Sequence, residues 1–345
     1  MSAGGRRIPI PPGWAFVLSV MVVFLFVLPA MTKGEVTDGS VNNLFQIFAA
    51  NAPIALALGL TMIAGEFDLS VIASYFLGGM LAVKFGGDSL APAIAIGAAA
   101  GLLAGTVVGW LVTRFRISSI PVSLGVFILV WGATNLLGHN VDVPYVHYEV
   151  TAEVIEPVAT YFTDQSLIVI GLFVVVGLFM AWSRFGRHLR AVGGDLRASR
   201  AAGVRVDRVL VATFALAGAI AAGGGALEGI ASASAVPNAG FTALPLAVIA
   251  VVIGGVAAAG GKGSVLGIGA GVLAIAILET TLSIVGAKEE LTSVITGTFL
   301  VVVAVVAAQG FRESRSVLGL QSMLRRMEGI AAPKPTNSTD AHADG

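Results

Sequence analysis

Long apolar stretches separated by short polar segments make up the chain from residue 13 to residue 308. The apolar positions run continuously instead of alternating, which is typical of membrane helices and excludes a membrane β-barrel. A helix needs about 20 mainly apolar residues to cross a bilayer. The pattern predicts ten helices, over residues 13–31, 43–64, 70–84, 90–113, 120–139, 166–183, 209–231, 245–260, 264–286 and 291–308.

Two of these stretches, 70–84 and 245–260, are short for a complete crossing, and the second contains Gly254 and Gly255. We expect them to be tilted, broken or partly re-entrant. The first stretch of the chain follows two arginines, as a cleaved signal peptide would. Its apolar run is longer than that of a signal peptide and no small-residue cleavage site follows it, so we expect a retained anchor.

The composition supports the same class of protein. Hydrophobic residues make up 56% of the 345 residues and charged residues only 12%, against about 25% charged residues in a soluble domain; the mean hydropathy is +0.91. A soluble fold needs charge to cover its surface, so a cytosolic enzyme and a disordered chain are excluded. The 20 basic residues balance 20 acidic residues, which leaves no basic excess for a nucleic acid. We predict an all-α polytopic membrane protein whose surroundings are the lipid bilayer.

The basic residues are distributed unevenly along the predicted spans. Ten spans place both termini on the same side of the membrane, and that side then carries 17 of the 20 Lys and Arg residues. Because Lys and Arg collect on the cytoplasmic side, we predict that both termini are cytoplasmic. The domain boundaries are then a cytoplasmic N-terminus at 1–12, a transmembrane domain at 13–308 and a polar, partly disordered tail at 309–345.

The longest predicted external loop, 140–165, carries five acidic residues and neither Lys nor Arg. Its length and acidity predict a solvated segment with a short surface helix around 150–156. Two interpretations stay open for this loop. It is either a solvated connection alone or a docking surface for an external partner.

Glycine recurs at every fourth position in two of the predicted helices. Without a side chain, such positions let two helix backbones approach closely in lipid, where no hydrophobic force drives helices together. We therefore expect tight helix packing along both series. The two series are Gly97, Gly101, Gly105 and Gly109, and Gly263, Gly267 and Gly271.

A few amide side chains interrupt the apolar helices and are candidates for a solute pathway. Amides hydrogen-bond hydroxyl groups, and aromatic rings cover the apolar faces of sugars, so the combination suits a polyhydroxylated solute. The alternative is structural: Asn42 or Asn43 caps a helix, and other amides bridge helices. The candidates for the pathway are Asn43, Phe45, Gln46, Asn51 and Asn135.

Two carboxylates, Glu228 and Glu279, fall inside predicted spans. A charge at the centre of a bilayer costs about 2.5–3.5 kcal/mol on insertion scales, so such groups face protein or water. Each of them either lines a pathway or is a protonated packing residue. An ion-coupled carrier would use one of them as a proton relay, although neither has a basic partner within a predicted span.

The sequence lacks the motifs of an enzyme. The stretch nearest to a phosphate-binding loop, 256–263, has Val256 in place of the first glycine and Gly263 in place of the required Ser or Thr. The chain contains no cysteine, and its four histidines form no zinc-protease motif. We predict no catalytic residue, no metal site and no cofactor, and therefore a passage for a solute.

The segment 184–208 between two predicted spans is strongly basic, with seven Arg, two Asp and one His. Asp195 is positioned to cap a helix that starts at Leu196, and Gly203 is positioned to end it. The segment either supplies charge that fixes the topology or forms a short helix parallel to the membrane, offered to a soluble partner.

This segment, GRHLRAVGGDLRASRAAGVRV, resembles the cytoplasmic coupling segment of bacterial sugar-type ABC transporter permeases, the ribose permease group. Asp195 stands where that family usually has Asn, and Ser199 where it usually has Ala; both replacements keep the size of the side chain. The positions that match are Gly186, Arg187, Ala191, Gly193, Gly194, Ala198 and Gly203.

Two further stretches resemble the same family, in the same order along the chain. Residues 65–82 resemble its GGIDLSVG segment but depart from it at Glu66, Phe67 and Ile72. Residues 247–273 resemble its glycine-rich run. The resemblance covers residues 40 to 308. The motif residues carried over are Asp68, Ser70, Gly254, Gly255, Gly261 and Gly263.

The resemblance implies the rest of a transport machine in the bacterial inner membrane. Two permease chains, identical or different, would form the pathway at their interface. A cytoplasmic ABC ATPase would carry ATP and Mg²⁺ and bind the coupling segment, and an extracytoplasmic binding protein would deliver the solute. The residues of the coupling segment expected to carry this contact are Gly194, Asp195, Ala198, Ser199 and Gly203.

From these observations we predict the permease subunit of an ATP-driven importer for a monosaccharide or related polyol. The same assembly with a nucleoside, an autoinducer or an amino acid as cargo is one alternative. An ion-coupled secondary carrier that uses Glu228 or Glu279 is the other. Asp68 and Ser70 are expected to cap the helix that follows them, with a role in a gate as the alternative.

Overall fold

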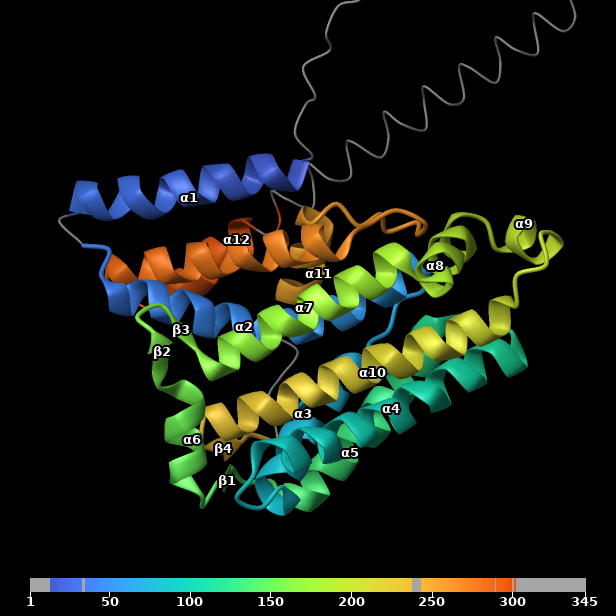
Figure 1. Ribbon diagram of the computed structural model, residues 1–345, viewed down its shortest axis with the longest axis horizontal. Helices are drawn as coiled ribbons and strands as arrows, with labels where there is room; N and C mark the ends of the chain where they lie inside the picture. Colours follow the sequence, from blue (N-terminus) through green and yellow to red (C-terminus); the bar gives the residue numbers. More distant parts are fainter. Residues whose placement is uncertain (1–12, 33–34, 238–242, 289, 300, 302–345) are drawn as a thin grey trace, which may run out of the picture. The chain divides into compact units, whose positions relative to one another are not determined.

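The computed structural model describes residues 13–32, 35–237, 243–288, 290–299 and 301 (Figure 1). The chain divides into two units at residue 300, and the account below concerns the first. The helices of this unit are α1 (Gly13–Thr32), α2 (Asp38–Ile63), α3 (Ser70–Phe85), α4 (Leu90–Phe115), α5 (Ser119–Gly138), α6 (Tyr148–Ile155), α7 (Asp164–Trp182), α8 (Arg184–Gly194), α9 (Leu196–Ala201), α10 (Val206–Ala231), α11 (Ala243–Ile253) and α12 (Val265–Ile284). Residues 290–299 are helical as well.

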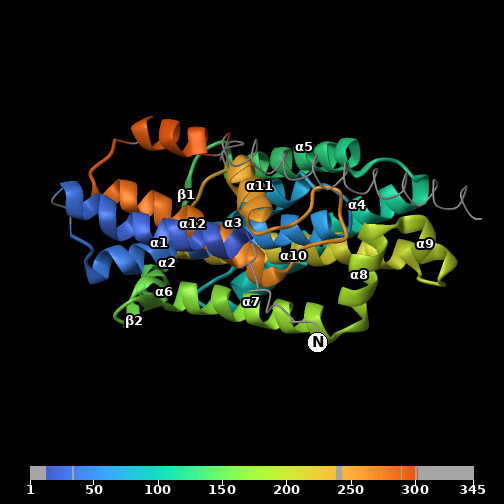
Figure 2. The same cartoon turned by 90° about the horizontal axis from the view of Figure 1, so that it is seen from above.

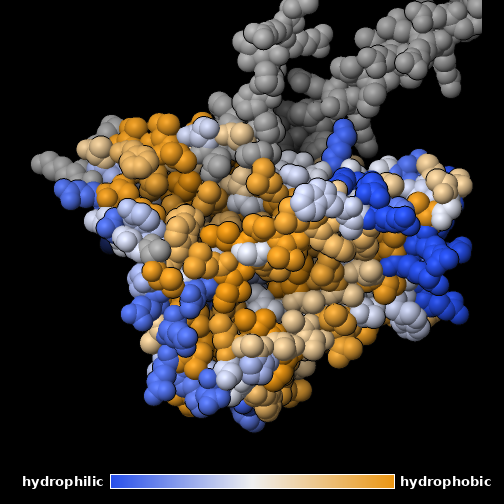
Figure 3. Space-filling model, in the orientation of Figure 1, coloured by the Kyte–Doolittle hydropathy of each residue, from blue (hydrophilic) through white to orange (hydrophobic). Residues whose placement is uncertain are grey.

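Six helices in the described part of the chain are long and apolar enough to cross a membrane: α2, α4, α5, α7, α10 and α12. Two apolar helices, α3 and α11, are shorter. On the face shown in Figure 3, hydrophobic residues cover the middle, and hydrophilic residues gather near α8 and α9 at one end and near α6 at the other. The prediction of an all-α polytopic membrane protein is confirmed.

The start of α2 corrects one expectation. Thr37 caps this helix: its Oγ1 accepts a hydrogen bond from Ser40 N at 3.2 Å, and Ser40 Oγ accepts one from Thr37 N at 3.4 Å. The helix therefore begins several residues earlier than the apolar run, and the expectation that Asn42 or Asn43 caps it is wrong. A reciprocal pair of this kind satisfies two amide donors at the helix end.

The predicted helix 245–260 is too long, because it ends before its second half, and the expected break at Gly254 and Gly255 is confirmed. α11 ends at Ile253, and Gly255 has a φ of +80°, which a helix does not contain. A Cβ on Gly254 would lie 2.6 Å from the carbonyl oxygen of Gly267, so the chain packs closely against α12 just after α11 ends. The second half of the predicted helix 291–308, the N-terminus 1–12 and the tail 309–345 lie outside the described residues.

The glycine series on α4 packs against α10, as the spacing predicted. A Cβ on Gly101 would lie 2.1 Å from the carbonyl oxygen of Gly218, and a Cβ on Gly105 would lie 2.0 Å from that of Phe214. Both distances are far below a van der Waals contact, so any larger residue would force the helices apart. In the view of Figure 2, α5 and α7 lie on opposite sides of α2, α3 and α10.

The second glycine series divides between a helix and a loop. Gly267 and Gly271 lie against α11, where added Cβ atoms would approach the carbonyl oxygens of Gly254 and Ala250 within 2.1 and 1.9 Å. Gly263 precedes α12, has a φ of +150° and faces Ile63 instead. Gly263 therefore packs within a loop, whereas the spacing predicted that it contributes to a helix–helix contact.

The segment 140–165 forms the short helix α6, close to the predicted range. Strand β1 (Val143–Pro144) pairs antiparallel with β4 (Ser234–Ala235), and β2 (Pro157–Ala159) pairs with β3 (Phe162–Thr163). The buried Tyr145 donates a hydrogen bond from its hydroxyl to the carbonyl oxygen of Gly87 at 2.6 Å. Thr151 donates to the carbonyl oxygen of Ile230 at 2.7 Å. The segment is therefore an ordered cover over the ends of α3 and α10, with most of its acidic side chains exposed.

Candidate functional site

The basic segment 184–208 forms two short helices, α8 and α9, at the end of the molecule opposite α6 (Figure 1). Asp195 separates them and caps α9, accepting hydrogen bonds on Oδ1 from Arg197 N and Ala198 N at 2.9 Å each. Gly203 follows the end of α9 with a φ of +81°. The predicted cap and the predicted start and end of this helix are confirmed.

Helix α8 was not predicted, although its sequence carries a signal. Ser183 caps it by accepting a hydrogen bond from Gly186 N at 3.1 Å. Gly186, Leu189 and Val192 are buried along one face, and arginines occupy much of the remainder. This is the pattern of a short helix with one apolar face that lies on the rest of the protein.

The outer surface of α9 is free for a partner. Gly194, Asp195, Ala198 and Gly203 are exposed, whereas Ser199 is buried beneath them. A cavity of about 480 Å³ lies beside this surface. The basic side chains that line this cavity are Arg184, His188, Arg205 and Arg208. Arg197 and Arg200 are exposed beside Ala198, so this surface and the cavity are both basic, which suits a partner with acidic side chains.

Three chain segments meet through glycines beneath α8, and we call Gly65, Gly193, Gly194, Gly260 and Gly261 the glycine junction. The backbone N–H of Gly261 donates a hydrogen bond to the carbonyl oxygen of Ile63 at 2.9 Å. A Cβ on Gly193 would lie 1.9 Å from that same oxygen, and a Cβ on Gly260 would lie 2.6 Å from Gly65 Cα. The end of α8 therefore makes close backbone contacts with the end of α2, the α2–α3 loop and the α11–α12 loop. The three motif stretches, separate in the sequence, come together here.

The α2–α3 loop is fixed by short polar contacts. Asp68 is fully buried and accepts hydrogen bonds on Oδ1 from Ser70 N at 2.9 Å and from Ser70 Oγ at 2.6 Å. The N-cap position of α3 is Leu69, which makes no side-chain cap bond, so the expected capping is limited to the bond that Asp68 accepts from Ser70 N. Burial raises the pKa of Asp68 to about 6, against an opposing effect of these two bonds. Phe67 N and Leu69 N donate to hydroxyl oxygens at the start of α5 at 3.1 Å, which binds the loop to that helix.

The amides predicted for a pathway do not form one cluster. Gln46 Nε2 donates to Asn42 Oδ1 at 2.6 Å, and Asn51 Nδ2 donates to the carbonyl oxygen of Ile47 at 3.0 Å. Both bonds stay within α2, so the expectation that Asn51 bridges two helices is wrong. Asn43 is exposed at the start of the same helix.

Asn135 and Phe45 lie apart from that group. Asn135 Nδ2 donates to Trp131 O at 2.8 Å within α5 and reaches Pro237 O, after β4, at 3.5 Å. The ring of Phe45 lies 4.5 Å from that of Phe162, centroid to centroid. Four of the five candidates of the pathway therefore lie on α2, and Asn135 lies on α5.

The two embedded carboxylates have different surroundings. Glu228, near the end of α10, accepts a hydrogen bond on Oε2 from Gln165 Nε2 at 2.7 Å and a longer one on Oε1 from Ser232 Oγ at 3.4 Å. It lines a cavity of about 210 Å³. Glu279, on α12, has no side-chain hydrogen bond to the part of the chain that the structure describes.

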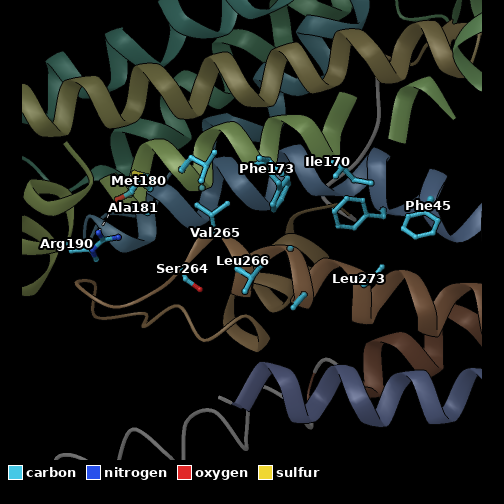
Figure 4. A pocket seen from close by; sticks show the side chains of 16 residues that line it. Phe45, Ile170, Phe173, Met180, Ala181, Arg190, Ser264, Val265, Leu266 and Leu273 are labelled. Atoms are coloured by element: carbon cyan, nitrogen blue, oxygen red, sulfur yellow. Dashed lines mark hydrogen bonds between the residues drawn. The ribbon is translucent and has the colours of Figure 1, made fainter. Parts of the chain in front are cut away.

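A larger, almost wholly apolar groove of about 710 Å³ lies between α2, α7 and α12 (Figure 4). Phe45, Phe173 and Leu273 line it, and Arg190 and Ser264 stand at one end. Arg190 Nη2 donates to the carbonyl oxygen of Met180 at 3.0 Å. A lining that is apolar except for Arg190 and Ser264 at one end suits hydrocarbon and not a polar solute. The apolar side chains of α7 extend all round the helix, so the sequence pattern did not single out the face that lines this groove.

Comparisons with known proteins agree with this architecture. A family model described as "Branched-chain amino acid transport system / permease component" matches residues 41–304. The ribose import permease protein of Escherichia coli strain K12 is 26% identical over 308 residues, which cover 83% of this chain and 91% of the relative. The fructose import permease protein of Rhizobium meliloti is 29% identical over 312 residues, which cover 86% of this chain and 85% of the relative.

A xylose transport system permease protein of Haemophilus influenzae is 25% identical over 333 residues, covering 78% of this chain and 89% of the relative. No solved structure matches the chain. The family model spans more than half of the chain, and the long apolar helices place the protein in the bacterial inner membrane as a multi-pass protein. The chain therefore belongs to the family of branched-chain amino acid transport system permease components, among its sugar-type ABC transporter permeases.

Proposed function

We propose that this chain is the permease subunit of an ATP-driven importer for a monosaccharide or related polyol. The relatives named above are permeases for ribose, fructose and xylose, which supports a monosaccharide as the cargo. The family description names branched-chain amino acids instead, and this keeps an amino acid as the second candidate cargo. In this proposal the chain crosses the membrane ten times with both termini in the cytoplasm.

The observation that carries the proposal is the glycine junction. Helix α9 and its neighbouring cavity offer an exposed handle, and α8 connects this handle by backbone contacts to the loops before α3 and α12. A partner that moves α8 and α9 would thereby displace both loops together, since no flexible side chain lies between the backbones. The proposed contact residues are Gly194, Asp195, Ala198 and Gly203, with Ser199 packed beneath them.

The proposal divides the work between several chains. The sequence has no phosphate-binding loop, so ATP and Mg²⁺ would be bound by a separate cytoplasmic ATPase. A second permease chain would complete the pathway, and an extracytoplasmic binding protein would deliver the solute to the end that carries α6. This chain itself would perform no covalent chemistry.

Reconstituted uptake tests this division of labour. The chain, its ATPase and its binding protein are placed in proteoliposomes, and the uptake of labelled ribose, fructose, galactose, xylose and leucine is followed with and without ATP. We expect ATP-dependent accumulation of at least one monosaccharide by the full assembly and none by this chain alone. Accumulation by the lone chain under an ion gradient would instead establish a secondary carrier that uses Glu228 or Glu279.

A further inference from the structure

The cavity beside Glu228 lies between α3 and α10, near the end of the molecule that carries α6. Its volume of about 210 Å³ equals roughly seven water molecules at about 30 Å³ each, which is the scale of one small solute. Tyr75 and Phe76 of α3 form one wall, and Glu228 and Ser232 of α10 form another. Val236, which is 41% exposed, stands at its rim, so the cavity has an accessible edge.

The carboxylate of Glu228 is held in place by neutral hydrogen-bond donors. Gln165 of α7, itself only 3% exposed, donates to Oε2 at 2.7 Å and fixes the side chain from a third helix. Oε1 has only the 3.4 Å contact with Ser232 Oγ. Within the described ranges the one ion pair, Arg200 with Asp207, lies elsewhere, so no basic side chain pairs with this carboxylate. A carboxylate can accept up to about four hydrogen bonds, and most of this capacity remains open.

The walls of the cavity complement a ring that carries hydroxyl groups. The hydroxyl of Tyr75 is already occupied, since it donates to the carbonyl oxygen of Ala50 at 2.9 Å, and only its ring faces the cavity region. The ring of Phe76 stands edge-on to it, at 5.4 Å between centroids. Gly79 and Gly225 also line the cavity, and they let α3 and α10 pack closely there, since a Cβ on Gly225 would lie 1.8 Å from the carbonyl oxygen of Tyr75. An open acceptor beside aromatic surface suits hydroxyls on one side of a solute and C–H groups on another.

A purely structural role explains this arrangement less well. A buried carboxylate costs free energy, and a packing position would be filled more favourably by an apolar residue. Glu279 shows the contrast, because it lines none of the cavities described above and has no comparable amide that orients it. Gln165 instead fixes the carboxylate of Glu228 at the wall of a cavity with an accessible rim.

We propose that this cavity is a subsite that holds one monosaccharide ring during its passage. The carboxylate of Glu228 accepts hydrogen bonds from two solute hydroxyls, and Phe76 covers an apolar face of the ring. The inference rests on the proposed function, since it takes the solute to be a neutral polyhydroxylated molecule. It makes Glu228 a residue that determines specificity, and Gln165 a residue that positions it.

The absence of cysteine from the chain allows a direct test. Val236→Cys places a single thiol at the rim of the cavity, in the complete transporter reconstituted in nanodiscs. Val146→Cys, at a residue 68% exposed and outside the cavity, is the matched control. The rate of modification by a small water-soluble methanethiosulfonate is measured against ribose, fructose, galactose, xylose and leucine. We expect a transported sugar to slow modification of the V236C variant and to leave the V146C variant unchanged.

The role of the carboxylate is tested in the same background. Glu228→Gln removes the charge-assisted hydrogen bonds, so the sugar concentration for half-protection should rise roughly tenfold or more. Glu279→Gln should leave it unchanged. Phe76→Leu should raise the sugar concentration for half-protection to a smaller extent. This variant keeps the test valid if the Glu228 variant assembles poorly.

The outcomes separate the subsite from the proposed function. Protection by no sugar, protection by leucine alone, or equal half-protection in the E228Q and Val236→Cys parent proteins overturns the subsite. If the unmodified complex transports no monosaccharide at all, the proposed function fails instead. Transport of a sugar that never protects the rim leaves the importer standing and removes only the subsite.

Discussion

The two ends of this molecule differ in how closely their elements pack. At the end with α8 and α9, the glycine junction brings three segments into close backbone contact, and Cβ atoms added to Gly193, Gly260 or Gly261 would overlap their neighbours. At the end with α6, a cavity of about 210 Å³ remains open beside Glu228. Close backbone packing transmits displacement because it cannot be compressed. A polar hollow provides hydrogen-bond partners for a solute.

Two carboxylates, Asp68 and Glu228, show the same contrast between the two ends. Asp68, at the junction end, directs Oδ1 to Ser70, its own neighbour in the chain, and has no bond to a distant helix. Glu228, at the cavity end, is held by Gln165 from another helix and borders open space. The carboxylate of Asp68 bonds the start of a helix, whereas the carboxylate of Glu228 lines a cavity. The predictions below test the junction end, where the larger mechanical effects are expected.

The largest effect is expected from a charge on the exposed face of α9. Ala198→Glu places an unpaired carboxylate in the surface that we propose enters the ATPase. Burying such a charge costs about 3–5 kcal/mol, so uptake should fall roughly hundredfold or more, and solute-stimulated ATP hydrolysis should fall to its basal rate. The measurement is ATP hydrolysis and uptake in proteoliposomes.

Ala91→Glu is the matched control for this variant, since Ala91 is exposed in the first turn of α4 at the opposite end. A negative charge is favourable near a helix N-terminus, so this variant should keep both activities. Full stimulation in the Ala198 variant would show that α9 does not carry the contact.

The next effect concerns pH and the buried carboxylate of the junction end. Because burial raises the pKa of Asp68 from 3.8 to about 6, the folded chain holds this proton more tightly than the unfolded chain. The resulting stability is present below about pH 4 and is lost as the pH rises to about 6, by up to about 3 kcal/mol. Asp68→Asn should remove this part of the pH dependence. Thermal unfolding of the purified chain in detergent between pH 4 and pH 8 measures it.

Asp142→Asn is the control, because Asp142 is exposed in the segment at the other end. That variant should retain the pH dependence of the original chain. An unchanged profile in the Asp68 variant would mean that the carboxylate does not titrate in this window, and the contrast between the two buried carboxylates would then lose one of its supports.

The sequence predicted the helices well and their assembly poorly. Continuous apolar runs located α3, α4 and α10 within a few residues, because lipid demands apolar side chains along the whole span. It missed the start of α2, since the cap at Thr37 lies in a polar stretch before the apolar run. It missed α8 because arginines hide its apolar face, and it extended α11 past Ile253 although it expected a break near Gly254 and Gly255.

The candidate site was recognised in pieces that the sequence could not join. The three motif stretches were read separately, and only the fold brings Ile63, Gly193 and Gly261 into contact. The bond between Gln165 and Glu228 joins residues 63 positions apart and leaves no local pattern. The role of the α2 amides in a pathway stays a prediction, because the structure shows only their hydrogen bonds within that helix.

The smallest effect is expected from two adjacent glycines at the end of α8. A Cβ on Gly193 would lie 1.9 Å from the carbonyl oxygen of Ile63, whereas a Cβ on Gly194 would meet no atom within 4 Å. Gly193→Ala should therefore destabilise the chain by about 1–3 kcal/mol through overpacking. Gly194→Ala should change stability little or raise it by up to about 1 kcal/mol, because alanine favours a helix over glycine. Thermal unfolding of both variants in the same detergent gives the comparison. Equal midpoints for the two variants would mean that the junction has room to adjust. A junction with that freedom could not pass the displacement of α8 to the two loops, and the contrast between a closed end and an open end would no longer hold.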